Sequence, residues 1–342
     1  MTQALQHNNF DGLRLAFALS VLFFHLGILS QSSQLAWLAE HLSATFGVQG
    51  FFFISGFLVT QSYENTASLK RYLEKRARRI FPAYVAVVAL AALGGCLLST
   101  LALRDYFASA DFWRYLAHNL MLSNFAAPTL PGVFVDNPRH AVNGSLWTIK
   151  VEVLFYLMVP VLVWLGRRYG ALKTMLAAAL LSLAWKIGLQ TLGEWADKPV
   201  LVKLSLQAPG QLSYFLGGML ALQRTQLGLA APRWWQAATG VATYALTDGI
   251  LADLLDPIAV YLIVYWLAIS VRKFGHWARY GDFSYGIYLF HWPTIQVFVW
   301  LGLFKTAPYG ATVLLVLTVL VLAVLSWLLV ERRFLPAARR AG

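Results

Sequence analysis

The sequence contains a single cysteine, Cys96, among its 342 residues. One cysteine cannot form a disulfide within the chain, and it cannot supply a cysteine cluster for a metal. We expect no metal cofactor. Charged residues are also scarce, at 12% of the chain against 59% apolar, whereas a soluble domain has about 25% charged residues. This composition excludes a disordered chain, a coiled coil and an ordinary water-soluble enzyme, and it indicates a polytopic membrane protein.

Internal repeats are absent as well, because no period of 20–50 residues recurs along the sequence, and this argues against a solenoid. We expect one integral-membrane domain over residues 1–342 with no appended soluble domain. The fold class that we expect is an all-α membrane bundle of about ten transmembrane helices, each needing about 20 mainly apolar residues. Several of the predicted spans are interrupted by Gly or Pro, and they cover residues 10–29, 44–63, 80–102, 145–166, 171–190, 209–224, 234–250, 257–271, 283–303 and 310–330.

Lys and Arg are unevenly distributed among the predicted loops. With the N-terminus inside, the inner segments hold 18 of them and the outer segments hold 6. Basic residues favour the cytoplasmic side of a membrane, so this ratio predicts that both termini are cytoplasmic. It also explains the net charge of +12 as anchoring at the inner leaflet of a lipid bilayer, and not as nucleic-acid binding. The longest connection, residues 103–144, is predicted to be outer.

Three ionisable residues lie in the first predicted span: Asp11, Arg14 and His25. At 100° per residue they share one helical face, with Arg14 and His25 roughly 16 Å apart along the axis. An Arg, Lys or Asp at the membrane centre costs at least about 2.5–3.5 kcal/mol, so this face is expected to meet protein or water. His25, in the outer half, is a catalytic candidate. The structural alternatives are a hydrogen-bonded core histidine and a buried pair of Asp11 with Arg14.

The fourth predicted span follows Asn143 and places Ser145 and Glu152 on one face, seven residues apart. Glu152 lies roughly 10 Å from the outer end of this helix, at a level similar to that of His25. If the two spans are neighbours, the carboxylate could fix the tautomer of His25 and orient it as a base. Asn143 or Ser145 could bind an oxyanion that develops during a reaction.

The ninth predicted span places Ser284, Tyr288 and His291 on one polar face at i, i+4 and i+7. Pro293 should kink this helix and free backbone groups near His291. A histidine that only packs and forms hydrogen bonds is the alternative interpretation of His291.

Arg76 and Arg79 lie three residues apart on one helical face, before the third predicted span. Paired guanidinium groups suit phosphate recognition. The alternative is that this cluster of six cations is only a topological anchor.

Together these stretches resemble the acyltransferase-3 family of integral-membrane acyltransferases, which includes O-antigen and other polysaccharide O-acetyltransferases. Gln49 departs from the family pattern, because it replaces an acidic residue often found there, and we assign it no role. The matching segments keep the family order and are Phe10–Arg14 with His25, Gly47–Phe57, Arg76–Pro82, Ser145–Tyr156, Ser284–His291 and Glu331.

The resemblance implies transfer of an acyl group, usually acetyl, from cytoplasmic acyl-CoA to a hydroxyl of an envelope glycan or lipid-linked oligosaccharide, in the bacterial inner membrane. It also implies that His25 is the catalytic histidine and that Arg14, Arg76 and Arg79 serve donor handling or activity. His25 could act as a general base or as an acyl carrier, and Tyr288 and His291 are further candidates for substrate or oxyanion contact. A secondary transporter of a small anionic or sugar solute is the main alternative from another class, and a structural assembly partner is a third.

Overall fold

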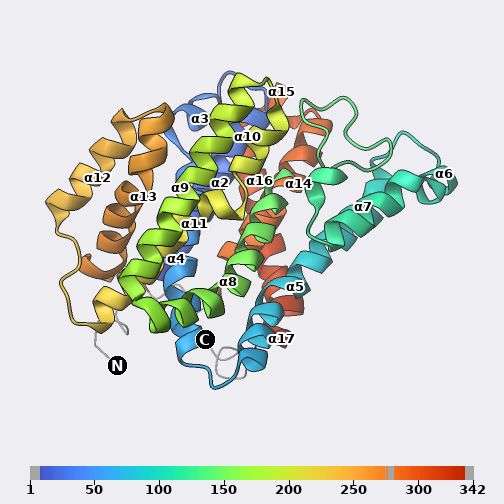
Figure 1. The fold of residues 1–342 in the computed structure, drawn as a ribbon. Helices are drawn as coiled ribbons and strands as arrows, with labels where there is room; N and C mark the ends of the chain where they lie inside the picture. The colour runs from blue at the N-terminus through green and yellow to red at the C-terminus, as the bar shows by residue number, and fades with distance from the viewer. Residues whose placement is uncertain (1–7, 274, 276–280, 336–342) are drawn as a thin grey trace. The chain divides into compact units, whose positions relative to one another are not determined.

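The structure is a computed structural model that describes residues 8–273, 275 and 281–335. Over these residues the secondary structure consists of helices and short helical turns, with no strand. The one extended pairing is an isolated bridge between Ser99 and Val133. The predicted all-α fold class is therefore confirmed (Figure 1).

The α-helices, in chain order, are α2 (Phe10–Leu29), α3 (Trp37–His41), α4 (Ala44–Glu64), α5 (Leu69–Gly94), α6 (Leu103–Ala108), α7 (Ala110–Leu120), α8 (Trp147–Tyr169), α9 (Ala171–Trp195), α10 (Pro199–Ser205), α11 (Ala208–Gln226), α12 (Trp234–Leu246), α13 (Gly249–Tyr265), α14 (Ser284–Trp300), α15 (Leu303–Thr306), α16 (Pro308–Ser326) and α17 (Arg332–Phe334). Short helical turns are η1 (Gly95–Leu97), η2 (Asn124–Ala126), η3 (Gly144–Leu146), η4 (Trp266–Ser270) and η6 (Trp327–Glu331).

Seven helices within the described residues are long and apolar enough to cross a membrane. They overlap seven of the ten predicted spans, and they run over Phe10–Leu29, Ala44–Glu64, Leu69–Leu97, Gly144–Tyr169, Ala171–Trp195, Gly249–Ser270 and Pro308–Phe334. The other three predicted spans correspond to α11, α12 and α14, which have 19, 13 and 17 residues. Because α12 is only about 20 Å long, against about 30 Å of hydrocarbon, the count of ten and the side of each terminus stay predictions.

The third predicted span differs from the observed helix at both ends. α5 begins at Leu69 and ends at Gly94, whereas the hydropathy pattern predicts a span over 80–102. The basic residues Arg76 and Arg79 therefore lie inside a continuous helix. The connection predicted over 103–144 is partly helical, because it contains α6, α7 and η2.

The chain divides into two compact units. The first contains residues 1–14, 48–74 and 151–276, and the second contains residues 15–47, 75–150 and 277–342. The boundaries fall inside α2, α4, α5 and α8, so each of these helices contributes residues to both units.

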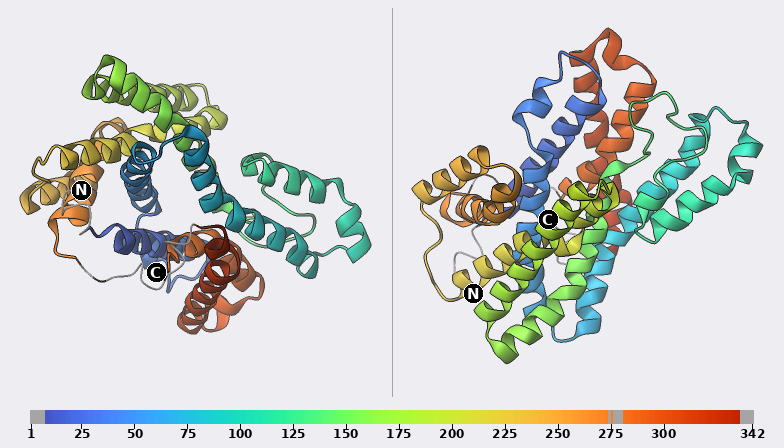
Figure 2. Two further views of the ribbon diagram at one scale, coloured as in Figure 1. Left: turned by 90° about the horizontal axis from the view of Figure 1, so that it is seen from below. Right: turned by 45° about the horizontal axis from the view of Figure 1, so that its top comes forward.

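In the first unit, α9 packs against α10 and α11, and α12 packs against α13 (Figures 1 and 2). α4 and α11 approach closely where they carry glycine. A Cβ atom at Gly56 would collide with the carbonyl oxygen of Phe215, and one at Gly218 would collide with that of Phe53. Small residues allow such backbone contact between membrane helices, which gives the glycine-rich segment of α4 a packing role.

Several polar groups within the first unit are paired with one another. The Gln49 side chain donates to the Tyr214 hydroxyl at 2.9 Å and accepts from the Tyr244 hydroxyl at 3.0 Å. Lys186 of α9 and Asp253 of α13 form an ion pair at 2.6 Å. Gln49 thus links α4, α11 and α12 through neutral hydrogen bonds, which explains how a residue without charge can occupy this buried position.

In the second unit, α14 packs against α16, and α6 and α7 form a hairpin that extends away from both (Figures 1 and 2). The hairpin is fixed by the buried Tyr106, whose hydroxyl donates to the carbonyl oxygen of Ala92 at 2.7 Å. Burial raises the pKa of Tyr106 to about 12, so its hydroxyl stays protonated and remains a donor near neutral pH.

Candidate active site

A pair of histidine rings lies at the centre of the candidate site, within the second unit. The Nδ1 atom of His25 (α2) lies 3.0 Å from the Nε2 atom of His291 (α14). The two rings are nearly parallel, with centroids 5.1 Å apart and an interplanar angle of 15°. His291 is fully buried, whereas His25 is partly exposed. The structure therefore brings together two predicted site residues that are 266 positions apart.

The hydrogen bonds around His291 define the tautomers of both rings. Its Nδ1 atom lies 2.8 Å from the carbonyl oxygen of Tyr288, and a carbonyl oxygen can only accept, so Nδ1 carries a proton. When both rings are neutral, Nε2 of His291 is then an acceptor, and Nδ1–H of His25 donates to it. This assignment leaves Nε2 of His25 as the nitrogen with an uncommitted lone pair.

Pro293 explains how the backbone of α14 supports this pair. Proline has no N–H group, so the carbonyl oxygen of Leu289, four residues earlier, has no helical donor. The side chain of Asn143 donates to that oxygen at 2.9 Å. The predicted release of a backbone group near His291 is therefore confirmed, and Asn143 is the residue that satisfies it.

Ser145 and Tyr288 lie in the same group of contacts. The Ser145 hydroxyl donates to Oδ1 of Asn143 at 2.7 Å, and the hydroxyls of Thr148 and Tyr288 lie 2.7 Å apart. All these side chains are buried. They hold η3 and the start of α8 against α14, and the predicted oxyanion roles of Asn143 and Ser145 stay predictions.

Trp292 completes the surroundings of His25 and was missed by the sequence-based reasoning. Its ring meets the His25 ring edge-on, with centroids 4.8 Å apart. A Cβ atom at Gly144 would lie 2.5 Å from the indole ring, so glycine allows η3 to approach it. The adjacency of Trp292 to His291 in the sequence is the one signal that could have pointed to it.

Arg79 has two carboxylate partners within the second unit. Its guanidinium lies 2.6 Å from Asp282 and 3.0 Å from Glu331, and it sits over the Tyr285 ring at 5.3 Å. The sequence reasoning missed Asp282, and it noted Glu331 only as a family position. The side chain of Arg79 is nearly buried, while Arg76, on the same helix, is partly exposed.

The remaining predicted site residues belong to the first unit. Glu152 accepts hydrogen bonds from the hydroxyls of Ser55 and Tyr156. Asp11 is exposed and Arg14 is partly exposed, and both lie on the same continuous helix as His25, as predicted. The pairing of Glu152 with His25 and the roles of Asp11 and Arg14 stay predictions.

These features define a class of protein: an α-helical integral membrane protein with a histidine pair, in which His291 is buried and the partly exposed His25 has a ring nitrogen with a lone pair. Comparison with known sequences then gives the family. A family model described as an acyltransferase domain matches residues 7–331. The chain therefore belongs to the acyltransferase-3 family and is a membrane acyltransferase, as the motifs predict.

Several relatives carry names that agree with this assignment. The chain is 30% identical to an O-acetyl transferase of Shigella phage Sf6, over 96% of each chain. It is 29% identical to Nodulation protein 10 of Rhizobium leguminosarum bv. viciae, over 95% of this chain and 92% of the relative. It is 26% identical to the peptidoglycan O-acetyltransferase OatA of Listeria monocytogenes serovar 1/2a, over 84% of this chain and 49% of the relative. No solved structure matches the chain significantly. The family and the O-acetyltransferase relatives do not favour the transporter alternative.

Proposed function

We propose that this protein transfers an acetyl group from cytoplasmic acetyl-CoA to a hydroxyl of an envelope glycan, such as O-antigen or another polysaccharide, in a bacterial inner membrane. The family and the O-acetyltransferase relatives support the reaction class. The observation that supports the proposed role of His25 is the 3.0 Å contact of its Nδ1 atom with Nε2 of His291. With Nδ1 of His291 donating to the Tyr288 carbonyl, this contact assigns the tautomer of His25 in which Nε2 has a lone pair.

In the direct course of the reaction, the acceptor oxygen attacks the carbonyl carbon of the thioester while Nε2 of His25 takes the hydroxyl proton. The C–S bond then breaks, and the imidazolium returns this proton to the leaving thiolate, which yields the ester and free CoA. Such general-base catalysis contributes typically 10²–10⁴-fold to a rate. In the second course, Nε2 attacks the thioester carbonyl carbon, the C–S bond breaks, and the leaving thiolate takes a proton from the acyl-imidazolium to give free CoA. The acceptor hydroxyl then attacks the acyl group, the bond between that group and Nε2 breaks, and the hydroxyl proton returns to the imidazole.

The donor is an anionic nucleotide with a long arm, and we assign its phosphates to Arg76 and Arg79 on α5. An Arg fork binds phosphate oxygens in the same bidentate way as carboxylate oxygens. Donor phosphates would therefore compete with Asp282 and Glu331 for Arg79. Arg14 retains the link to donor handling that the family resemblance implies.

The test uses purified protein in lipid nanodiscs with acetyl-CoA radiolabelled in the acetyl group and envelope glycan extracted from the source cells. We expect His25→Ala to lower label transfer by about 10²–10⁴-fold. The matched control is His41→Ala, since His41 is an exposed histidine of the same unit whose ring hydrogen-bonds to the Trp37 carbonyl of its own helix. Undiminished transfer by His25→Ala would remove this histidine from the mechanism.

The same assay distinguishes the two courses. A covalent acyl-enzyme predicts ping-pong kinetics and label bound to the protein when the acceptor is omitted. Direct transfer predicts a ternary complex and no labelled protein. Solute uptake into liposomes without any label transfer would instead contradict the proposed function.

A further inference from the structure

A fully buried glutamine, Gln296, lies on α14 one turn beyond Trp292 and forms no part of the histidine pair. A polar side chain in a mainly apolar, buried helix must have partners for its amide. Gln296 finds all of them in one place, the chain segment 137–145 that leads into η3. This segment belongs to the second unit, as do α14 and His25.

The Gln296 side chain binds segment 137–145 through both ends of its amide. Its Nε2 atom donates to the carbonyl oxygens of Arg139 and Ala141, at 2.5 and 2.8 Å. Its Oε1 atom accepts from Asn137 at 3.1 Å. One side chain thus binds the backbone of the segment at Arg139 and Ala141 and the side chain of Asn137.

Two further contacts hold segment 137–145 to α14. The Trp292 indole donates to the carbonyl oxygen of Ala141 at 3.1 Å, and Asn143 donates to that of Leu289 at 2.9 Å. Three successive turns of α14 therefore hold the segment, and the same helix supports His25 through His291. An element that is fixed relative to the reactive nitrogen in this way can position a substrate.

The segment keeps its backbone bound but exposes charged side chains. Arg139 and His140 are exposed, and over the described residues their side chains form no hydrogen bond or ion pair. The Trp292 ring contacts His25 and also donates to the carbonyl oxygen of Ala141. Arg139 is therefore two residues from Ala141, which Trp292 connects to the His25 ring. An arginine side chain there can reach a sugar unit adjacent to the one that presents its hydroxyl to His25.

We infer that segment 137–145 binds the acceptor, and that Arg139 selects a glycan carrying a carboxylate on or next to the acetylated unit. This inference rests on the proposed function. The guanidinium presents a planar fork of donors that matches a carboxylate, and its backbone is held in place by Gln296. Gln296 is a positioning residue in this account, because it acts through the segment and not on the substrate.

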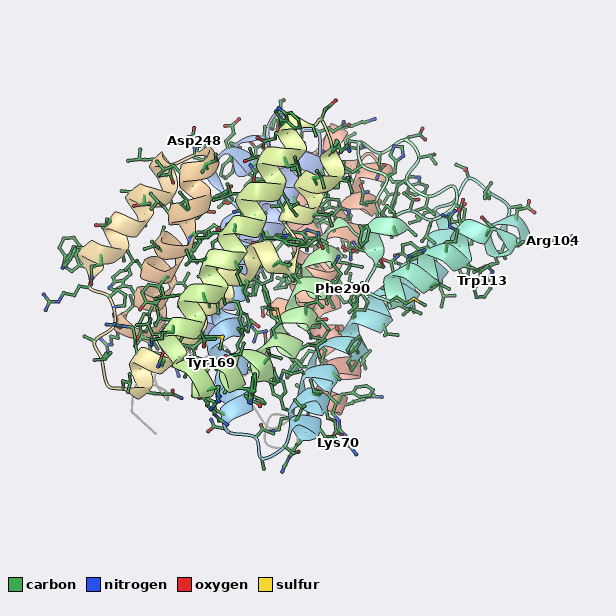
Figure 3. All side chains as sticks on the ribbon, viewed as in Figure 1. Lys70, Arg104, Trp113, Tyr169, Asp248 and Phe290 are labelled. Carbon is green, nitrogen blue, oxygen red and sulfur yellow. The ribbon has the colours of Figure 1, made fainter. Side chains whose placement is uncertain are left out.

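The test measures label transfer from acetyl-CoA, by protein in nanodiscs, to an oligoglucuronate and to the neutral oligosaccharide made from it by carboxyl reduction. Hydrolysis of acetyl-CoA without acceptor is measured in parallel, because it reports the catalytic histidine alone. Arg139→Gln is compared with Arg104→Gln as the matched control. Arg104 is an exposed arginine at the far end of the α6–α7 hairpin, away from α14 and its Phe290 (Figure 3).

We expect the wild type to prefer the acidic acceptor, and Arg139→Gln to raise its KM for that acceptor about 10–100-fold, as expected for the loss of a charge-assisted hydrogen bond. kcat, hydrolysis of acetyl-CoA and transfer to the neutral acceptor should remain as in Arg104→Gln. Gln296→Glu, which keeps the shape but loses both donations, should raise KM for both acceptors while hydrolysis persists.

The inference is overturned if the wild type hydrolyses acetyl-CoA but prefers the neutral acceptor or uses neither. It is equally overturned if Arg139→Gln transfers to the acidic acceptor as efficiently as the wild type. A wild type that neither hydrolyses acetyl-CoA nor transfers its acetyl group would instead contradict the proposed function, and the inference with it.

Discussion

The reactivity of His25 depends on the residue bound to the other nitrogen of its ring. In hydrolase triads a carboxylate holds this nitrogen and stabilises the imidazolium that forms. Here the partner is a neutral imidazole, His291, whose own orientation is fixed by the Tyr288 carbonyl. Such a partner fixes the tautomer without adding a negative charge to a buried site, where an unpaired carboxylate would be costly.

We predict that replacing His291 lowers kcat more than it changes the KM for either substrate. His291→Phe removes the acceptor for Nδ1–H of His25. We expect kcat to fall at least about tenfold. The upper limit is about 10⁴-fold, which is the loss seen when the residue that fixes the tautomer in a hydrolase triad is replaced. His291→Gln should recover part of this loss, because its amide oxygen can accept the same hydrogen bond. The measurement is steady-state label transfer, with folding checked by size-exclusion chromatography. Equal activity of the phenylalanine and glutamine variants would show that His291 only fills space.

At the scale of elements, α14 supports both the ring of His25, for which we propose a catalytic role, and segment 137–145, and its own position depends on α16. Gly286 lies where the two helices meet, and a Cβ atom there would lie 2.8 Å from the Cα atom of Ala323. The obstacle is backbone, so it cannot move aside as the end of a flexible side chain could. The helices would have to separate to accept even one methyl group.

Gly286→Ala should therefore destabilise the protein although alanine favours helices. Overpacking of this kind costs about 1–3 kcal/mol, and the displaced α14 should also lower the rate of acyl transfer. Thermal unfolding in detergent, together with the transfer assay, measures both effects. Gly94→Ala is the control, because a Cβ atom at the end of α5 would have no neighbour within 4 Å. An unchanged midpoint for Gly286→Ala would contradict the close packing of α14 against α16.

At the scale of the whole molecule, features that depend on neighbouring residues in the sequence were predictable. Hydropathy located most helices, and the 3.6-residue repeat placed Arg14 and His25 on one continuous helix, as observed. Partnerships between distant residues were not predictable in this way. The carboxylates of Arg79 are 203 and 252 residues away from it, and no local pattern shows which of several polar faces will meet. Pro293 was an exception, because the position of the freed carbonyl follows from the covalent chain, although its partner Asn143 does not.

The predicted orientation in the membrane is a property of the entire chain, and it rests on the 18 basic residues on one predicted side against 6 on the other. The chain has a single cysteine, so Cys96→Ser gives a background without thiols. In this background one new cysteine is placed before α5, as Ala67→Cys, or after it, as Arg104→Cys. α5 has 26 residues and is about 39 Å long, so it is longer than the roughly 30 Å hydrocarbon core and can place its two ends on opposite sides. Both positions are exposed, so either thiol can react once a reagent reaches it.

A membrane-impermeant maleimide added to intact cells, with the outer membrane permeabilised, should label Arg104→Cys and leave Ala67→Cys unlabelled until the inner membrane is opened. The reverse pattern would invert the topology and place His25 in the half of the membrane nearest the cytoplasm, where the acetyl group of the donor would have no membrane to cross.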